Sequence, residues 1–370
     1  MKNKQSFTRT LITCISVVPV AAFLMMLNSC GGPGNLNAYG VDTTKGLKDF
    51  YKDYFPIGVA VAPSSLEGAQ AELIKKNFNS LTPENVMKPG PIHPEENRYF
   101  WDDADKIVEF AQANGMKVRG HTLCWHSQTA PWMFKDADGN QVTKDVALER
   151  LKDHVTTVVS RYKGKVYAWD VLNEIVADGD DTAKIYRDNS PWLNICGEEF
   201  IPKLFQWAHE ADPDAVLFYN DYNTENPVKR DKIYKMLKKL LDEGAPVNAV
   251  GLQGHWNIEN PTEQNLRDAI DKFSSLGLQV QVTELDVSIY TGRNDTIDMG
   301  FTPEREQKQI DLYKMVFKVF REKKDVITGV TFWNVYDGRS WLNRGNRMAY
   351  PLLFDVNMKP KKVYWEVVKF

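Results

Sequence analysis

Two glutamates, Glu174 and Glu284, stand in short apolar runs of the sequence, WDVLNE at 169–174 and VTELDV at 282–287. In the second run, strict strand alternation places Glu284 and Asp286 on the same face. An unpaired buried carboxylate is costly, so these acids need partners or a function. Hydrolysis of a glycosidic bond requires such a pair, one carboxyl protonated to assist the leaving oxygen and one ionised. Burial and mutual repulsion can separate their pKa values.

Each glutamate taken singly also fits a structural ion pair, for example with Lys88 or Arg119. That explanation weakens for the two together, because histidines and tryptophans stand near the same predicted strand ends. The tryptophans at strand ends suit stacking on flat sugar rings: Trp125, Trp333 and Trp341. Trp169 lies inside a run, and we expect it to belong to the core.

Three histidines, His121, His126 and His255, are candidate zinc ligands by residue type. Zinc sites usually show local pairs such as H-E-x-x-H, and the sequence has none. We therefore expect no metal and no cofactor, and expect the histidines to hydrogen-bond sugar hydroxyls or a nucleophile. A G-x-S-x-G motif is also missing, which argues against a serine esterase.

Eight short apolar runs alternate with helical stretches from about residue 46 onward. The predicted strands are PIGVAV (56–61), NSLTPEN (79–85), KVRGHTLCW (117–125), VYAWDVLNE (166–174), AVLFYNDYN (215–223), NAVGLQGHW (248–256), LQVQVTELD (278–286) and GVTFWNVYD (329–337). Near-continuous apolar runs are typical of parallel strands buried on both faces. Eight such βα units predict an α/β fold, a (β/α)₈ barrel forming a single catalytic domain. A doubly wound open sheet is the alternative, but no G-x-G-x-x-G turn is present.

Helix start signals support this alternation. Asn260 followed by Pro261 predicts a capped helix start, with Glu263 three residues after the cap. Thr302 and Pro303 predict the start of another helix.

The first 29 residues resemble a secretory signal, with a basic start and the apolar run LITCISVVPVAAFLMML at 11–27. Cys30 follows directly, before GGPGN, as in a bacterial lipoprotein in which this cysteine is acylated. A plain signal peptide and a retained anchor are the alternatives. We expect residues 1–29 to be removed, 30–45 to form a flexible tether, and 46–370 to form the barrel. The protein would then be exported and held at a membrane, on the periplasmic or cell-surface side.

The formal net charge of −3 comes without any block of Lys and Arg, so we expect no nucleic-acid partner. Cys124 and Cys196 are far apart in the sequence and fit no metal spacing, so we expect free thiols.

The motifs at the predicted strand ends resemble glycoside hydrolase family 10, the endo-1,4-β-xylanases. They are TPENVMK (82–88), HTLCWHSQTAPW (121–132), WDVLNE, NDYN (220–223), GLQGHW (251–256), VTELDV and FWNVYD (332–337), in the family's order. The similarity extends from about residue 46 to 370. It implies a retaining enzyme that acts on xylan and xylo-oligosaccharides by double displacement, and we expect a monomer.

The resemblance also implies individual roles. Glu174 matches the acid/base and Glu284 the nucleophile, which sets an expected carboxyl separation of roughly 5 to 5.5 Å. The matched supporting residues are Asn173, which binds the 2-hydroxyl, His255 and Asp286. The matched substrate-binding residues are Glu84, Asn85 and Lys88 on the non-reducing side, His121, Trp125, Gln253, Trp333 and Trp341 around the cleaved sugar, and Tyr222 on the leaving-group side.

Three other functions remain open from the sequence. They are a related barrel β-1,4-glucanase, a non-catalytic lipid-anchored glycan-binding protein, and a zinc hydrolase. The intact pair of glutamates argues against the second, and the histidine spacing against the third. The stretch DGRSWLNRGNRMAY (337–350) keeps Trp341 but departs from the common family form around it, which leaves the accepted xylan branches open.

Overall fold

The computed structural model describes residues 36–292 and 297–370. The predicted signal sequence and Cys30 lie outside the described residues. The second part of the expected tether, residues 36–45, forms a turn closed by a bridge between Leu36 and Asp42, and Val41 in it is buried. Contacts with the barrel therefore begin ahead of the expected domain boundary at residue 46.

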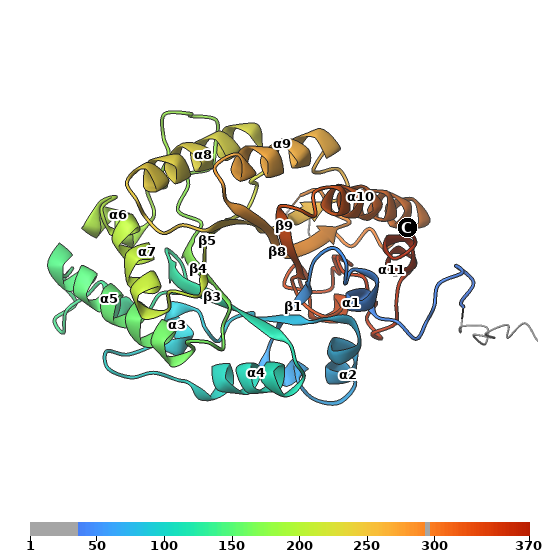
Figure 1. The fold of residues 1–370 in the computed structure, drawn as a ribbon, viewed down its shortest axis with the longest axis horizontal. Coiled ribbons are helices and arrows are strands. Elements are labelled where there is room, and N and C mark those ends of the chain that lie inside the picture. Colours follow the sequence, from blue (N-terminus) through green and yellow to red (C-terminus); the bar gives the residue numbers. More distant parts are fainter. Residues whose placement is uncertain (1–35, 293–296) are drawn as a thin grey trace, which may run out of the picture. The chain divides into compact units, whose positions relative to one another are not determined.

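Eight parallel strands form a closed barrel (Figure 1). The strands of the structure are β1 (Ile57–Val61), β2 (Ser80–Pro83), β3 (Lys117–Trp125), β4 (Ala168–Asn173), β5 (Val216–Asp221), β6 (Ala249–Leu252), β7 (His255–Asn257), β8 (Gln279–Ser288) and β9 (Ile327–Phe332). Neighbours follow the order β6-β5-β4-β3-β2-β1-β9-β8, and pairing of β6 with β8 closes the ring. This confirms the predicted barrel and excludes the open sheet, because no barrel strand is left with an unpaired edge.

The sixth predicted strand is divided in two. Gly254 adopts a φ of +80°, which favours glycine, and separates β6 from the short β7. Strand β7 pairs only with β8, with His255 opposite Asp286. The break therefore places His255 opposite an acid of the neighbouring strand.

Each barrel strand is followed by a helix on the outside of the ring (Figure 1). The α-helices are α1 (Leu47–Phe50), α2 (Gly68–Asn77), α3 (Pro89–Ile92), α4 (Asp102–Ala113), α5 (Lys144–Arg161), α6 (Pro191–Cys196), α7 (Phe200–Ala211), α8 (Pro227–Asp242), α9 (Glu263–Ser274), α10 (Pro303–Glu322) and α11 (Lys362–Val367). Short 3₁₀ turns occupy Pro63–Ser65, Pro131–Met133 and Asp337–Arg339.

One predicted helix start is confirmed and the other is wrong. Thr302 caps α10, where its side chain accepts from the Arg305 N–H. Helix α9 is capped by Thr262 rather than by Asn260. The backbone N–H and C=O of Asn260 are both hydrogen-bonded to Asn257 in a turn, so Asn260 belongs to this turn and not to the helix.

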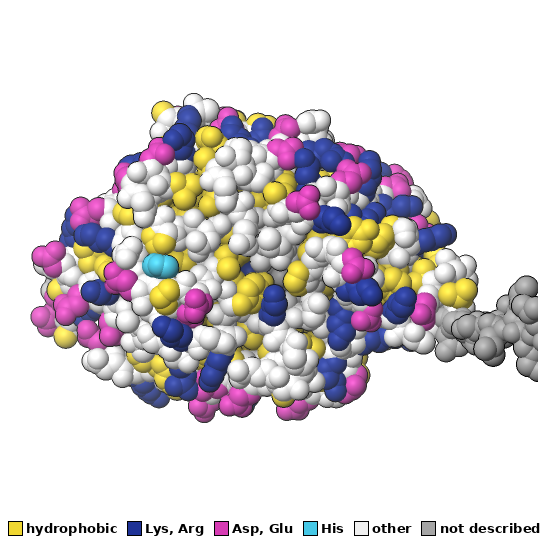
Figure 2. Space-filling view, viewed as in Figure 1, with side chains coloured by type: hydrophobic (Ala, Val, Ile, Leu, Met, Phe, Trp, Pro, Cys, Tyr) yellow, Lys and Arg dark blue, Asp and Glu magenta, His cyan; other side chains and the backbone are white. Residues whose placement is uncertain are grey.

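The main apolar core lies between the strands and the surrounding helices. Helix α10 buries Tyr313, Phe317 and Phe320 against it, and Trp169 is fully buried as expected. Cys124 and Cys196 are buried free thiols, which confirms that prediction. On the face seen in Figure 2, positive and negative side chains are interspersed. Within 36–292 and 297–370, no helix combines the length and apolar character needed to cross a bilayer.

Candidate active site

The predicted catalytic and sugar-binding side chains meet in one cavity at the carboxyl ends of the barrel strands, where such barrels carry their active sites. All of them line this cavity except Asp286, which contacts it through His255. The lining residues come from around the whole barrel: Glu84, Asn85, Lys88, His121, Trp125, Asn173, Glu174, Tyr222, Gln253, His255, Glu284, Trp333 and Trp341.

Glu284, in β8, is buried, and two side chains contact its carboxylate. His255 Nε2 lies 3.1 Å from one of its carboxylate oxygens, and Asn220 Nδ2 donates to the other at 2.8 Å. The other nitrogen of His255 lies 3.0 Å from Asp286, so the ring joins the two acids of β8. Trp341 Nε1 also donates to Asp286, at 2.8 Å. This network gives both oxygens of Glu284 and Oδ2 of Asp286 polar partners, while Oδ1 of Asp286 is buried without a hydrogen-bond partner among the described residues.

The same contacts fix the charge of Glu284. Burial would raise the pKa of Glu284, but the hydrogen bond from His255 and attraction to His121 outweigh burial and hold the pKa below its usual value. Burial would lower the pKa of His255, yet Asp286 and Glu284 raise it to about 10. The imidazole is therefore protonated near neutral pH and donates to both acids, while Glu284 is ionised.

Asn220, on β5, connects Glu284 to two neighbouring side chains through hydrogen bonds. Besides Glu284, its Nδ2 donates to Asn173 Oδ1 at 2.8 Å, and its Oδ1 accepts from Thr283 at 2.6 Å. A Cβ on Gly251 would approach Asn220 Oδ1 to 2.2 Å, so the amide fits only beside a glycine. Because Asn173 accepts through its oxygen here, its own N–H groups remain to donate to a sugar hydroxyl.

Glu174 follows β4 with a φ of +55°, an uncommon conformation for a residue with a side chain. Its carboxylate accepts from Trp125 Nε1 and from Gln253 Nε2, each at 2.9 Å. Burial and the negative charge of Asp221 nevertheless raise the pKa of Glu174 above its ordinary value. Gln253 also accepts the backbone N–H of Glu284 at 2.7 Å, so one residue bonds to both glutamates.

Asp170, inside β4, joins two other buried polar side chains beneath the site. It bonds to His121 Nδ1 at 2.9 Å and to Arg119 Nη2 at 2.6 Å, and all three side chains are buried. Burial would raise the pKa of Asp170, but Arg119 and His121 hold it below its usual value. Arg119 is thus paired with Asp170 and not with either catalytic candidate.

Lys88 lies at the end of the cavity formed after β2. Its Nζ donates to Asn85 Oδ1 at 2.9 Å and lies 5.1 Å from the centre of a Trp125 ring. Burial lowers the pKa of Lys88, while Glu284, Glu84 and Glu174 oppose that shift. A cation and an amide are therefore presented beside the carboxylates, where they can donate to sugar hydroxyls.

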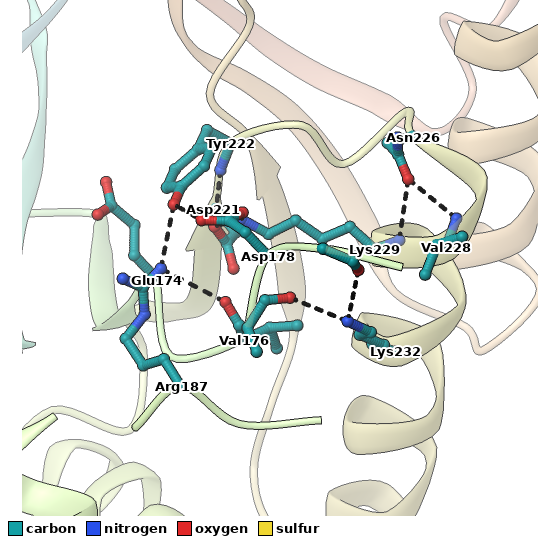
Figure 3. Close-up of polar contacts among 12 residues, drawn as sticks. Glu174, Val176, Asp178, Arg187, Asp221, Tyr222, Asn226, Val228, Lys229 and Lys232 are labelled. Atoms are coloured by element: carbon teal, nitrogen blue, oxygen red, sulfur yellow. Dashed lines mark hydrogen bonds and ion pairs between the residues drawn. The ribbon is translucent and has the colours of Figure 1, made fainter. Parts of the chain in front are cut away.

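Tyr222, after β5, belongs to a second polar network close to Glu174 (Figure 3). Its hydroxyl donates to Asp178 and accepts from Arg187 Nη2 at 3.2 Å. Lys229, on α8, lies 2.9 Å from both Asp178 and Asp221, and 3.4 Å from the centre of the Tyr222 ring. These contacts hold the loop after β4 against α8 and fix the Tyr222 ring at the mouth of the cavity.

His126 is not part of a metal centre in this arrangement. Its Nε2 accepts from Arg187 Nη1 at 3.1 Å, and burial together with the charge of Arg187 lowers its pKa to about 4. Across residues 36–292 and 297–370, no group of three or more His, Cys, Asp or Glu side chains is placed to hold a metal ion.

Several residues of the site were not predicted as site residues from the sequence. Asn220 and Asp170 lie inside motifs that drew attention for other residues, and their polar character within apolar strands was the available signal. Arg187 and Lys229 lie in a loop and on α8, and no local pattern points to them.

Comparisons with known proteins agree with this geometry. The model of the family described as Glycosyl hydrolase family 10 matches residues 46–370. The chain is 52% identical over 329 residues to "Beta-1,4-xylanase" of Dictyoglomus thermophilum, covering 88% of this chain and 90% of that protein. It is 47% identical to "Endo-1,4-beta-xylanase A" of Caldicellulosiruptor saccharolyticus, covering 88% and 95%.

A solved structure gives the same picture. The crystal structure of xylanase XynB from Paenibacillus barcinonensis, complexed with a conduramine derivative, superposes with a TM-score of 0.85 at 44% identity, covering 89% of this chain and 99% of that one. The barrel, the carboxylate pair and these matches lead to one conclusion: the chain is a glycoside hydrolase and belongs to glycosyl hydrolase family 10.

Proposed function

We propose that this protein is a retaining endo-1,4-β-xylanase that cuts internal bonds of xylan by double displacement. The observation that carries this proposal is the opposed state of two carboxyls in one cavity. The pKa of Glu174 is raised and that of Glu284 is lowered, so one is ready to give a proton and the other to attack.

In the first step, a Glu284 oxygen bonds to the anomeric carbon of the sugar while the glycosidic C–O bond breaks. Glu174 gives its proton to the leaving oxygen, and a glycosyl-enzyme ester remains on Glu284. In the second step, Glu174, now ionised, takes a proton from water as that water attacks the same carbon and releases Glu284. His255 holds the nucleophile throughout, and Asn173 donates to the 2-hydroxyl of the sugar.

The shape of the cleft supports cleavage inside a chain. The catalytic cavity, of about 480 Å³, is followed by a second cavity of about 490 Å³ beyond Tyr222. Tyr222, His255 and Trp341 line both, so the groove continues past the carboxylates without a closed end there. Several sugar units can therefore lie on both sides of the cleaved bond.

Xylan is favoured over a β-1,4-glucan because xylose lacks the hydroxymethyl group of glucose. The family resemblance sets Trp341 and Lys88 beside the position where that group would project, and both line the catalytic cavity. The test compares kcat/KM on matched xylo- and cello-oligosaccharides, and also compares rates on xylan and on carboxymethyl-cellulose. A Glu284→Gln variant is assayed alongside the wild type. Equal efficiency on both sugars would support the glucanase, and an inactive wild type would support a glycan-binding protein.

We further propose that the exported protein is a monomer anchored by acylation of Cys30, on the periplasmic or cell-surface side of a bacterial membrane. The support is the order of a basic start, an apolar run and Cys30 followed by glycines. Acyl chains contribute about 0.8 kcal/mol per buried methylene, so two or more give stable attachment. Membrane fractionation of the full chain tests this proposal.

A further inference from the structure

The cavity beyond Tyr222 lies on the leaving-group side of the cleaved bond. Glu84, Asn85 and Lys88 line only the catalytic cavity, at the end that the family resemblance assigns to the non-reducing side. The second cavity lies at the other end and is lined by residues of β7 and β8 and by residues that follow β4, β5, β8 and β9. Sugar units released after the first step must therefore pass along this second cavity.

Arg344 is an exposed cation on the wall of this second cavity that follows β9. Its Nη1 donates to the backbone oxygen of Trp341 at 3.1 Å, and both residues line the second cavity. The backbones of Arg344 and Arg347 exchange two hydrogen bonds of 2.9 Å, so the turn carrying both arginines is closed on itself. Among the described residues, no carboxylate lies within ion-pair distance of Arg344.

Arg347 lies on the same wall and is 4% exposed. Its guanidinium lies 4.4 Å from the centre of the Tyr290 ring, and Nη2 donates to the Leu342 oxygen at 3.3 Å. Nε and Nη1 have no hydrogen-bond partner in the described part of the chain. Arg347 also attracts the carboxylate of Asp298, whose Oδ1 accepts hydrogen bonds from the Tyr290 hydroxyl and the Gly300 N–H. The wall therefore carries positive charge with unsatisfied donors.

The wall that follows β4 has the opposite character. Asp178 and Asp180 line it, and Lys229 pairs with Asp178. Asp180 has no ion-pair partner among the described residues, so this wall repels anions. An anionic group that enters the second cavity is directed towards Arg344.

The main chain of xylan is neutral, and its acidic groups are uronic acids attached as branches. A carboxylate matches the fork of N–H donors on a guanidinium. We propose that Arg344, backed by Arg347, binds the carboxylate of a glucuronic acid branch carried by the leaving-group part of xylan. This inference rests on the proposed xylanase function and names the branch that the cleft recognises.

The experiment uses two substrates that differ only in charge. One is a xylo-oligosaccharide with a single glucuronic acid branch, and the other is the same compound with its carboxyl group reduced to an alcohol. The measured quantity is the ratio of kcat/KM on the acidic substrate to kcat/KM on the reduced one, with product masses locating the branch. Arg344→Gln is expected to lower this ratio about two- to fivefold, the range for an exposed ion pair. Arg344→Glu should lower it further, and Arg344→Lys should restore part of it.

A separate control tests whether the change in this ratio depends on the position of the lost charge. Arg98→Gln removes an equal charge from an exposed arginine that pairs with Glu95 and lines no part of the cleft, and it should leave the ratio unchanged. The wild-type ratio should also fall as salt rises from about 0.01 M to about 1 M. An unchanged ratio in both Arg344→Gln and Arg344→Glu, or products with the branch only on the non-reducing side, would overturn the proposal. A wild type that does not cut unbranched xylohexaose would instead refute the proposed function.

Discussion

Replacing Trp125 with phenylalanine should move the basic limb of the pH profile of kcat/KM to higher pH. An indole N–H can only donate a hydrogen bond, and that of Trp125 donates to Glu174 at 2.9 Å. This bond stabilises the ionised carboxylate more than the protonated acid, which lowers the pKa of Glu174. Without it, Glu174 should keep its proton to a higher pH.

The size of the shift follows from the energy of that bond. A hydrogen bond to a charged group contributes about 1.5–3 kcal/mol, and one pKa unit corresponds to about 1.36 kcal/mol. Complete loss would raise the pKa of Glu174 by about one to two units. Gln253 still donates to the other oxygen at 2.9 Å, and water can replace part of the lost bond. We therefore expect a shift of about one unit.

The assay measures kcat/KM on xylohexaose from roughly pH 4 to roughly pH 10, where the limbs report ionisations of the free enzyme. Trp333→Phe is the matched control, because Trp333 lines the same cavity and no hydrogen bond joins it to Glu174 in the described structure. Both variants should lose activity through weaker sugar binding, but only Trp125→Phe should move the limb. A limb that stays in place, or that moves equally in both variants, would refute this account of the Glu174 pKa.

Three other variants test separate parts of the account. Glu174→Ala should lose most activity on xylan yet still form the intermediate from an aryl xylobioside whose leaving group needs no proton, and azide should then speed turnover and give a β-configured azide; an α-configured azide would contradict this. Cys30→Ala should move the protein from the washed membrane fraction to the soluble one; retention in the membrane would refute the anchor. His93 and His154 are buried 3.2 Å apart, and burial lowers their pKa values to about 4 and about 3, so both are neutral in the folded state. The unfolded chain takes up these protons below about pH 6.5, so stability should fall as the pH drops towards 4 and 3, by about 1.4 kcal/mol per pH unit for each histidine. His154→Gln should flatten this dependence in denaturant titrations, and an unchanged slope would assign the acid sensitivity to other groups.

The barrel could be predicted because the sequence encodes it locally. Each apolar run is long enough for one strand, and the run KVRGHTLCW became β3 with the same bounds. The split of the sixth strand at Gly254 could not be predicted, because a continuous apolar pattern does not reveal where pairing passes from the barrel to β7. The start of α9 was placed too early because the pairing of Asn260 with Asn257 depends on a turn that the helix signals do not describe.

The residues of the site were predictable where they stand at strand ends in motifs. Glu174 and Glu284 are separated by more than a hundred positions, yet barrel closure brings them to one cavity. Partners that act from another element were not predictable in this way. Lys229 reaches Asp178 and Asp221 from α8, and such a contact depends on the distance between elements rather than on sequence spacing. The separation of the two catalytic carboxyls, expected at roughly 5 to 5.5 Å, stays a prediction.

The stereochemistry of the first product tests the central claim most directly. If Glu284 forms a covalent intermediate and Glu174 activates the water, two displacements occur at the anomeric carbon and its configuration is kept. Proton NMR of wild-type enzyme with xylohexaose, recorded before mutarotation, should then show the β-anomer first. An α-anomer as the first product would mean a single displacement by water, and would contradict the assignment of Glu284 as the nucleophile.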